Sequence, residues 1–467
     1  MTKNRTKIIA TVGPSCSDVS VLSSMIESGV NCFRVNLSHG TQDEKKSYFD
    51  LIKSISDSSN KTRPSILADL AGPKVRVREL KKSFKLSVGQ IVTVSSLEDG
   101  DGIIPISKDL IFESYDPGAK IMINDGKISL EIIEQTSNHS FKCKTIVPGK
   151  VKSKKGVNFL GVLLNVPSLT PQDEKDLALA LENGADWVAL SFTRSQNDYD
   201  LVKSKINKLG FNTPVMAKIE KWEAVKNLDS IVQAFDGVMV ARGDLGVELP
   251  LEQVPVIQKS IIKKAKLYGK PVVIATQMLD SMIENPTPTR AEVSDIANSI
   301  LDGADALMVT GETAMGKYPT DVIDVLSDVI KETEKSLKFY SRTIGKDTVD
   351  SISGAISHAA CTIAKDLDLK SIVTMTQSGG TARMVSSFRP SANVYAMTTL
   401  KSTFRSLSII WGVIPVLVNQ YNSADEMPEL AKQKLLDMKV LNKEEKFIIT
   451  GGVPVNVPGT TNYISIL

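Results

Sequence analysis

Residues 182–192 read ENGADWVALSF, and this short stretch decides the fold. A helical segment stops at an Asn-Gly pair, and a short apolar run follows at once. Residues 301–312 repeat the same unit as LDGADALMVTGE. A glycine turn between a helix and a buried strand is typical of proteins in which helices alternate with the strands of a parallel sheet.

The same order of helix, turn and strand recurs along most of the chain. Apolar runs that predict strands lie at 7–13, 31–39, 65–72, 186–192, 215–220, 237–244, 271–278 and 305–312. Eight strands alternating with helices favour an α/β fold of the (β/α)8 TIM-barrel type. On this pattern alone, an open doubly wound sheet is the alternative.

Two regions depart from the pattern and suggest further domains. Residues 73–167 alternate in polarity and contain the turn signals EDGDG, NDG and VPGK, which predict an all-β insert after the third barrel strand. A helix should resume after Thr170, a good N-cap followed by Pro171. A smaller α/β domain should follow from about residue 346. We therefore expect barrel segments at 1–72 and 168–345, an insert at 73–167 and a C-terminal domain at 346–467.

Composition excludes several classes of protein. The chain has 467 residues and a net charge of +3, so it gives no reason to expect nucleic acid or an anionic membrane as a partner. No apolar run is long enough to cross a bilayer, and the first residues lack a signal-peptide pattern. Four cysteines without a CxxC pair favour a reducing cytoplasm, and three scattered histidines argue against a histidine-rich metal site.

Charged and hydroxyl side chains follow most of the predicted barrel strands. The carboxyl ends of barrel strands meet at one mouth, and alternate strand residues share a side. The side chains expected at this mouth are Arg34, Asn36, Ser38, Asp69, Lys218, Glu220, Arg242, Asp244, Thr276, Thr310 and Glu312. The mouth should therefore combine carboxylates, cations and hydroxyls.

Glu220 and Asp244 form the best candidate pair for a divalent metal, because Mg²⁺ takes one or two protein carboxylates and completes its shell with water and substrate. Arg34 and Lys218 beside such a metal indicate a phosphorylated, multiply anionic substrate. The backbone N–H groups of RGDLG, which begins at Arg242, could hold a carboxylate.

Each assignment has a structural alternative. The two carboxylates could simply pair with Lys218 and Arg242, Asp69 could be structural, and Thr276 could be a satisfied core hydroxyl. The segment TQSGGTA lies between a predicted strand and a helix, so it favours a phosphate-binding loop over a plain turn. The C-terminal region has no GxGxxG fingerprint, so a nicotinamide cofactor is not indicated.

Long, ordered motifs give the sequence a resemblance to the pyruvate kinase family from end to end. They include TKIIATVGPS, FRVNLSHG, LADLAGPKVR, KSKKGVNF, AKIE, VARGDLGVELP, IATQMLDSM, PTPTRAEVSDIANSILDGADALMVTGETAMGKYP and TQSGGTARMVSSFRP. The resemblance implies a barrel domain, an inserted small β-barrel lid domain and a C-terminal α/β regulatory domain. It also implies transfer of a phosphoryl group from phosphoenolpyruvate to ADP, giving ATP and pyruvate in the last step of glycolysis.

The resemblance also assigns roles to individual residues. Lys218 would stabilise the phosphoryl group in flight, and Thr276 would lie on the route by which the enolate is protonated. Arg34, Lys218, Gly243, Asp244 and Thr276 would bind substrate. Glu220 and Asp244 would hold Mg²⁺, and Asn36, His39, Arg76 and Lys155 would face the nucleotide under the lid.

A monovalent-cation pocket is a further implication. Many members hold K⁺ with residues matching Asn36, Ser38, Asp69 and the backbone of Leu70, and they carry glutamate where this chain has Lys74. An ammonium group there can replace the charge of K⁺ and repel the ion itself. We therefore expect that K⁺ is not required and that Asp69 pairs with or lies near Lys74.

Regulation and assembly are implied only by resemblance. Thr376, Ser378 and Thr381 match an effector loop for a phosphorylated allosteric effector, and members of the family are usually homotetramers. Two other functions stay open from the residues alone. One is a metal-dependent lyase or aldolase acting on pyruvate enolate, and the other is a non-catalytic metabolite sensor.

Overall fold

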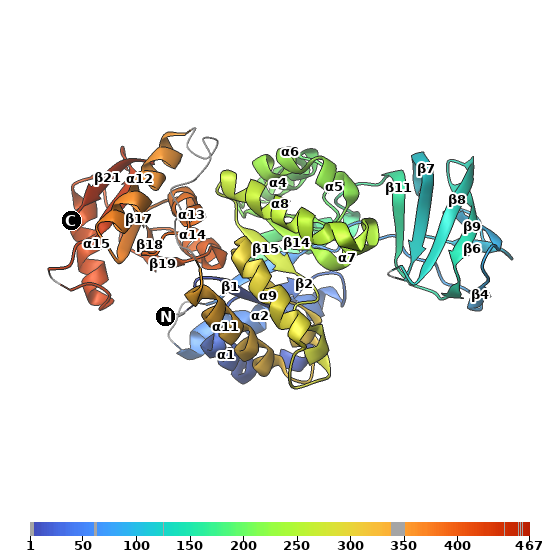
Figure 1. Cartoon of the computed structure of the whole chain (residues 1–467), viewed down its shortest axis with the longest axis horizontal. Helices are drawn as coiled ribbons and strands as arrows, with labels where there is room; N and C mark the ends of the chain where they lie inside the picture. The colour runs from blue at the N-terminus through green and yellow to red at the C-terminus, as the bar shows by residue number, and fades with distance from the viewer. Residues whose placement is uncertain are drawn as a thin grey trace.

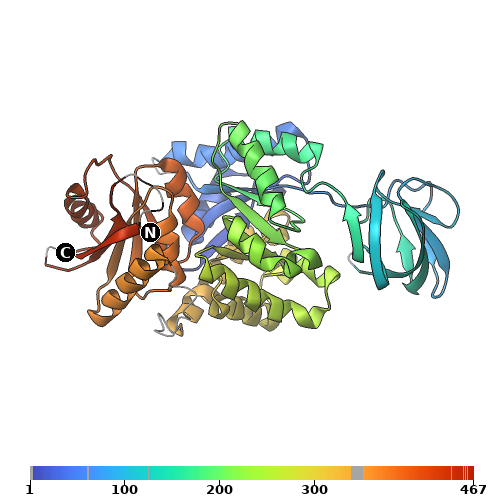
Figure 2. The ribbon, with the colours of Figure 1, turned by 90° about the horizontal axis from the view of Figure 1, so that it is seen from above.

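The computed structural model describes residues 4–59, 63–124, 126–337, 351–442, 444–455, 457, 459 and 461–467. Three parts lie in a row in Figure 1. The insert is at one end, the barrel is in the middle and the C-terminal domain is at the other end. Figure 2, turned by 90°, shows the same order, with the insert joined to the barrel through a narrow connection.

Eight parallel strands close into a ring in the order β1-β16-β15-β14-β13-β12-β3-β2. The closed ring confirms the barrel and excludes the open sheet. The strands are β1 Lys7–Thr11, β2 Val30–Asn36, β3 Ser65–Asp69, β12 Trp187–Leu190, β13 Val215–Ile219, β14 Gly237–Ala241, β15 Val272–Ala275 and β16 Ala306–Val309.

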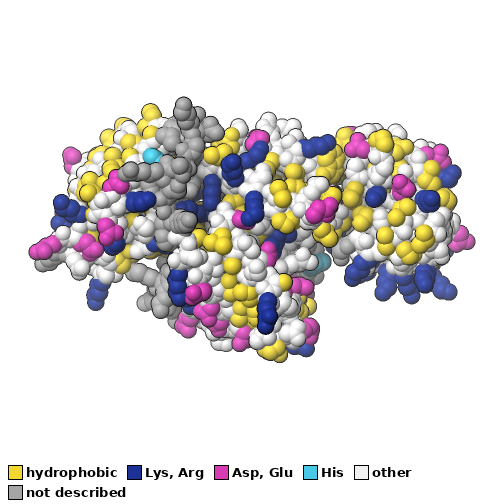
Figure 3. Space-filling model, viewed as in Figure 1, with side chains coloured by type: hydrophobic (Ala, Val, Ile, Leu, Met, Phe, Trp, Pro, Cys, Tyr) yellow, Lys and Arg dark blue, Asp and Glu magenta, His cyan; other side chains and the backbone are white. Residues whose placement is uncertain are grey.

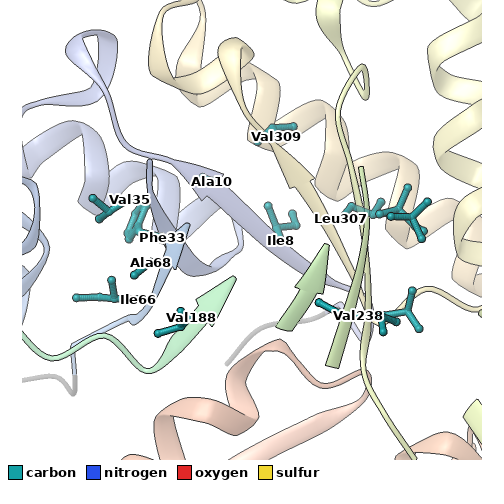
Figure 4. Packing of buried hydrophobic residues seen from close by; sticks show 14 of the residues in the cluster. Ile8, Ala10, Phe33, Val35, Ile66, Ala68, Val188, Val238, Leu307 and Val309 are labelled. Atoms are coloured by element: carbon teal, nitrogen blue, oxygen red, sulfur yellow. The ribbon is translucent and has the colours of Figure 1, made fainter. Parts of the chain in front are cut away.

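Alternation along each strand divides the barrel residues into two sets. One set packs outward under the helices, and Figure 4 labels Ile8, Phe33, Ile66 and Leu307 among it. The other set belongs to a second cluster and includes Ile9, Cys32, Leu67, Ala189, Met216, Met239 and Met308. Because strand side chains alternate, the residue two positions after each of these points to the same side of its strand and lies nearer the mouth.

One sequence-based prediction about the strand ends is wrong. β14 stops at Ala241, and Arg242 begins the helix α7 Arg242–Glu248, so Arg242 and Asp244 do not alternate along a strand. Asp244 lies in the first turn of α7, where the positive end of the helix dipole favours a carboxylate. The charges still lie at the mouth, but a helix positions them.

Helices follow the strands and cover the ring. They are α1 Val19–Ser28, α2 Gln42–Ser59, α3 Pro171–Glu182, α4 Asn197–Lys208, α5 Trp222–Lys226, α6 Leu228–Ala234, α7, α8 Val254–Leu267, α9 Arg290–Asp302, α10 Gly311–Ala314 and α11 Pro319–Lys335. Thr170 caps α3 as predicted: its side chain accepts from the backbone N–H of Asp173, and the Asp173 side chain accepts in return from Thr170.

The repeated GAD units have the same structural role at both positions. Asp186 Oδ2 accepts the backbone N–H of Ile66 at 2.9 Å, and Asp305 Oδ2 accepts that of Val272 at 2.9 Å. Each aspartate also pairs with an arginine of the C-terminal domain, Arg405 at 2.7 Å and Arg389 at 3.0 Å. The repeat therefore joins neighbouring strands and also docks the C-terminal domain against the barrel.

The insert is all-β, and its core is its own hydrophobic cluster. A six-stranded sheet has the order β11-β7-β8-β9-β5-β6, and β10 pairs with β4 beside it. The strands are β4 Phe84–Leu86, β5 Ile91–Ser95, β6 Ile103–Pro105, β7 Ile111–Ile123, β8 Ile128–Ser137, β9 Ser140–Val147, β10 Gly149–Val151 and β11 Val157–Asn165. In Figure 3, Lys and Arg side chains gather along the lower edge of the insert.

The C-terminal domain is a five-stranded sheet with helices. Its strand order is β19-β18-β17-β20-β21, in which only β21 is antiparallel to its neighbour. Its elements are α12 Ile352–Asp366, β17 Ser371–Met375, α13 Gly380–Ser387, β18 Asn393–Thr398, α14 Lys401–Ser406, β19 Val413–Leu417, α15 Glu426–Asp437, β20 Ile448–Gly452 and β21 Thr461–Ile466. In the described part of the chain, no helix has the length and apolar character needed to span a bilayer.

Candidate active site

Lys218 lies at the centre of the barrel mouth, near the end of β13. Its Nζ is 3.2 Å from Asp69 Oδ1 and 2.9 Å from Glu220 Oε1, and it donates to Ser191 Oγ at 2.7 Å. Burial opposes the charge of the ammonium group, but the two carboxylates outweigh it and raise the pKa of Lys218 above its ordinary value. The structure therefore favours the charged form of Lys218 and fixes its ammonium group at one point of the mouth.

Arg34 lies in the same network, at the end of β2. Its guanidinium contacts Asp69 Oδ2 at 2.8 Å through two nitrogens and donates to Thr11 Oγ1 at 3.2 Å. Burial alone would raise the pKa of Asp69, but Lys218 and Arg34 lower it below the ordinary value. Asp69 thus stays ionised and orients two cations toward the same space.

Glu220 and Asp244 present two carboxylates to this mouth. Glu220 is 1% exposed, and its Oε2 accepts the backbone N–H of Phe192 at 2.8 Å. Burial raises the pKa of Glu220, Lys218 opposes this rise, and nearby Asp244 adds to it. The side chain of Asp244 is 32% exposed. Two neighbouring carboxylates, one of them open to the mouth, fit a divalent cation whose remaining ligands come from water and substrate. The described residues contain no group of three or more His, Cys, Asp or Glu with metal-binding geometry.

Gly243 and Thr276 meet beside these carboxylates. Thr276 Oγ1 accepts the backbone N–H of Gly243 at 2.8 Å, and the Thr276 carbonyl accepts from Arg242 at 2.8 Å. Thr276 has a φ of 70°, an uncommon conformation for a β-branched residue. Such strain concentrates at functional sites, where neighbouring contacts hold it in place.

The four candidate nucleotide residues come from two parts of the molecule. Asn36 ends β2, where its Oδ1 accepts the backbone N–H of Ser38, and His39 is exposed just after it. Arg76 lies on the first connection to the insert, and its guanidinium donates to the Lys154 carbonyl at 3.1 Å. Lys155 is exposed next to that carbonyl. The structure thus groups them as a barrel pair and a lid pair.

The residues of the predicted monovalent-cation pocket differ from expectation in one contact. Ser191 Oγ donates to the Leu70 carbonyl at 2.7 Å, while Ser38 is exposed. The expected pairing of Asp69 with Lys74 is wrong, because in the described residues Asp69 pairs with Arg34 and Lys218. Lys74 Nζ instead lies 3.7 Å from Asp244 Oδ1.

The loop predicted to bind an effector, residues 376–382, borders a cavity of about 250 Å³ between the C-terminal domain and the barrel. Thr376 Oγ1 accepts the Gly379 N–H at 3.0 Å, Thr381 Oγ1 bonds Thr461 Oγ1 at 2.7 Å, and Ser378 is exposed. Lys270 and Arg383 also line the cavity, and burial lowers the pKa of each. The loop sequence has no lysine, but the fold places two cations beside it.

Sequence reasoning missed Ser191 and Thr11 as members of the network. Ser191 follows β12 directly and contacts Lys218, and Thr11 ends β1 and contacts Arg34. Strand periodicity could have found both, since each lies two residues after an inward-facing position, Ala189 and Ile9. Their small hydroxyl side chains drew less attention than the charges.

A closed barrel with a charged mouth, a β insert beside the mouth and a separate α/β domain defines an enzyme that binds an anionic substrate. The profile "Pyruvate kinase, barrel domain" matches residues 3–323, and "Pyruvate kinase, alpha/beta domain" matches residues 354–467. The chain belongs to the pyruvate kinase family and is a phosphotransferase.

Individual relatives agree over their whole length. The pyruvate kinase of Thermotoga maritima is 44% identical over 467 residues, covering 99% of each chain. That of Clostridium acetobutylicum is 38% identical and also covers 99% of each chain. A crystal structure of a pyruvate kinase from Cryptosporidium parvum superposes with a TM-score of 0.89 at 30% identity, covering 99% of this chain and 96% of that one.

Proposed function

We propose that this chain transfers the phosphoryl group of phosphoenolpyruvate to ADP with Mg²⁺, giving pyruvate and ATP. The observation that carries the proposal is the Lys218 ammonium group, held by Asp69, Glu220 and Ser191 at the barrel mouth. Phosphoryl transfer depends on positioning and charge stabilisation more than on covalent catalysis, and a preorganised cation provides both.

Glu220 and Asp244 would hold the divalent metal, which supplies charge neutralisation for the enolate and phosphoryl oxygens when bound. Arg34 and Lys218 would contact the phosphoryl group from the barrel side. The N–H groups of Gly243 and Asp244, together with the Thr276 hydroxyl, would orient the substrate carboxylate.

Thr276 is also our proposed route for the proton that the enolate carbon receives. Its oxygen already accepts the Gly243 N–H, so its own hydroxyl proton remains available for donation. A water relay would carry the proton from this hydroxyl to the carbon. The strained backbone of Thr276 supports a functional role for this residue.

The nucleotide would lie between the barrel pair Asn36 and His39 and the lid pair Arg76 and Lys155. Closure of the lid would bring the two pairs onto the phosphates of ADP and exclude water from the phosphoryl group in flight.

The proposed lid is the insert, residues 73–167, between barrel segments 1–72 and 168–345. The proposed regulatory domain is 346–467.

We propose that K⁺ is not required. Arg34 and Lys218 both pair with Asp69, and Lys74 adds a third positive charge near Asp244. Arg34 and Lys218 already compensate the charge of Asp69, the carboxylate of this pocket, so a bound monovalent cation would gain little there. The ammonium group of Lys74 would take over the electrostatic role of the ion.

A phosphorylated effector would bind the cavity beside Thr376, Ser378 and Thr381. The half-buried cations Lys270 and Arg383 line that cavity, and a phosphate would compensate the charge that burial disfavours.

We also propose a cytoplasmic homotetramer. All four cysteines are free and buried, which suits a reducing compartment, and Leu251 and Val256 are 73% and 68% exposed, which suits a subunit interface.

The test is a pyruvate-release assay with phosphoenolpyruvate and Mg²⁺, run with and without ADP. We expect release only when ADP is present, with one ATP formed for each pyruvate. Loss of phosphoenolpyruvate without ADP would instead indicate a lyase or aldolase, and no turnover in either case would indicate a sensor. Light scattering of the purified chain tests the tetramer.

A further inference from the structure

Two segments of the lid contact α7. On the first connection, Lys74 Nζ lies 3.7 Å from Asp244 in the first turn of α7. On the lid strand β11, Asn158 Nδ2 donates to Glu248 Oε1 at 3.0 Å, and Glu248 is the last residue of α7. The lid therefore holds both ends of the short helix that carries Gly243 and Asp244.

Glu248 joins a third segment to these two. The same Oε1 accepts from Lys221 Nζ at 2.7 Å, and the Glu248 side chain is 0% exposed. Lys221 directly follows Glu220, the carboxylate at the end of β13. One buried oxygen thus links the lid strand β11, the helix α7 and the segment that leaves β13.

Stability alone gives no reason for a carboxylate at this position. Glu248 Oε2 is buried and has no hydrogen-bond partner among the described residues. A buried charge is costly unless it is paired and fully hydrogen-bonded. Well-packed apolar side chains commonly stabilise a protein as well as a buried ion pair does. The arrangement therefore fits a residue that positions other groups.

We propose that Glu248 is a positioning residue that transmits the position of the lid to α7, so that ADP binding and substrate binding strengthen each other. This inference rests on the proposed placement of the nucleotide under the lid. When the lid moves, Asn158 moves with β11 and displaces Glu248. Because α7 spans only seven residues, the displacement reaches Gly243 and Asp244 at its other end.

The experiment measures how much each ligand strengthens the binding of the other. ADP and pyruvate cannot react together, because pyruvate has no phosphoryl group to give to ADP. Calorimetry in Mg²⁺ buffer gives the Kd of pyruvate with and without saturating ADP, and the ratio is the coupling factor. We expect a factor of about 5 or more for the parent, the lower end of typical coupling between sites.

Asn158→Leu removes the lid's hydrogen bond to Glu248 and keeps both the side-chain size and the Glu248–Lys221 ion pair. We expect its coupling factor to fall to about 1, while the Kd of each ligand measured alone stays within about twofold of the parent. Equal weakening of both ligands with the coupling preserved would show a merely structural role and overturn the proposal. A parent coupling factor of 1 would overturn it as well.

Two further variants separate the possible failures. Arg194 donates to the carbonyls of Leu164, near the end of β11, and of Val166, which follows that strand. Arg194→Gln should therefore retain the coupling. A fall in its coupling factor as large as that of Asn158→Leu would contradict a specific role for Glu248. Arg76→Ala should weaken ADP binding alone. If it does not, the nucleotide placement fails, while the coupling factors of the parent and Asn158→Leu still decide the role of Glu248.

Discussion

The hydroxyl of Ser191 helps to fix the ammonium group of Lys218 at the barrel mouth. It accepts from Lys218 Nζ at 2.7 Å and donates to the Leu70 carbonyl at 2.7 Å. The ammonium group is thus fixed by a neutral acceptor as well as by the carboxylates of Asp69 and Glu220. A fixed cation needs little reorganisation when charge moves in the transition state.

Ser191→Ala should therefore lower kcat more than it raises the KM of phosphoenolpyruvate. A hydrogen bond to a charged group contributes about 1.5–3 kcal/mol, which corresponds to a fall in kcat of roughly tenfold or more. Steady-state kinetics measures the effect, and an unchanged thermal midpoint confirms that the fold is intact. An unchanged kcat would show that Ser191 does not position Lys218.

Lys74 gives a second prediction at this scale. In a buffer with tetramethylammonium as the only monovalent cation, the parent should keep its activity, because Lys74 supplies the charge near Asp244. Lys74→Glu should lower activity and make the remainder depend on K⁺. A large loss in the parent without K⁺, restored by adding K⁺, would contradict the prediction.

Some of these residues could be predicted from sequence and others could not. The two-residue period of side chains along a strand predicted that Arg34 and Lys218 lie at the mouth, since each lies two residues after an inward-facing position. The same rule failed for Arg242, because α7 begins where the strand was expected to continue. The partner of Lys74 also could not be predicted, because it depends on the path of the connection to the insert.

At the scale of elements, β1 joins the barrel to the C-terminal domain through its first residue. Lys7 is 2% exposed, and its Nζ donates to the Val413 carbonyl of β19 at 3.0 Å. Burial lowers its pKa to about 8, while nearby Glu334 opposes this shift. In the folded state Lys7 therefore loses its proton at lower pH than in the unfolded chain.

This shift predicts how stability changes with pH. Above pH 8 and up to the ordinary lysine pKa, the unfolded state binds more protons at Lys7 than the folded state, so the contribution of Lys7 to stability rises with pH. The free energy of unfolding of the parent should gain about 2–3 kcal/mol relative to Lys7→Met between pH 7 and pH 10.5. Urea unfolding at several pH values measures this difference. A constant difference across that range would contradict the shifted pKa.

Element order was predictable because glycine turns and N-caps are local signals. Thr170 and Pro171 begin α3 as predicted, and the GAD repeats precede β12 and β16. The contacts of Asp186 and Asp305 with arginines of the C-terminal domain were not predictable, since the partners lie far away in sequence. Such docking depends on the packing of whole domains.

At the scale of the molecule, the C-terminal domain and the lid lie at opposite ends of the barrel, as Figures 1 and 2 show. The cavity beside the predicted effector loop includes Asp236, which immediately precedes β14, and α7 follows the other end of that strand. A ligand in the cavity would therefore lie next to a strand that leads directly to Gly243 and Asp244.

This arrangement predicts which cations an effector needs. If a sugar phosphate or AMP activates the parent, Lys270→Met and Arg383→Met should each raise the concentration for half-activation by about tenfold, the loss of one charge-assisted hydrogen bond. Lys263→Met, an exposed lysine of α8, is the matched control and should change nothing. Equal activation of all four proteins would exclude Lys270 and Arg383 from the effector site.

The central claim is that the fixed charge of Lys218 stabilises the phosphoryl group as it passes from phosphoenolpyruvate to ADP. The most direct measurement is kcat for ADP-dependent pyruvate release by the parent, by Lys218→Met and by the exposed control Lys208→Met, together with the Kd of phosphoenolpyruvate for each. We predict a fall in kcat of about 100-fold or more for Lys218→Met only, with a much smaller change in Kd. A Lys218→Met enzyme with a kcat near that of the parent would contradict the claim.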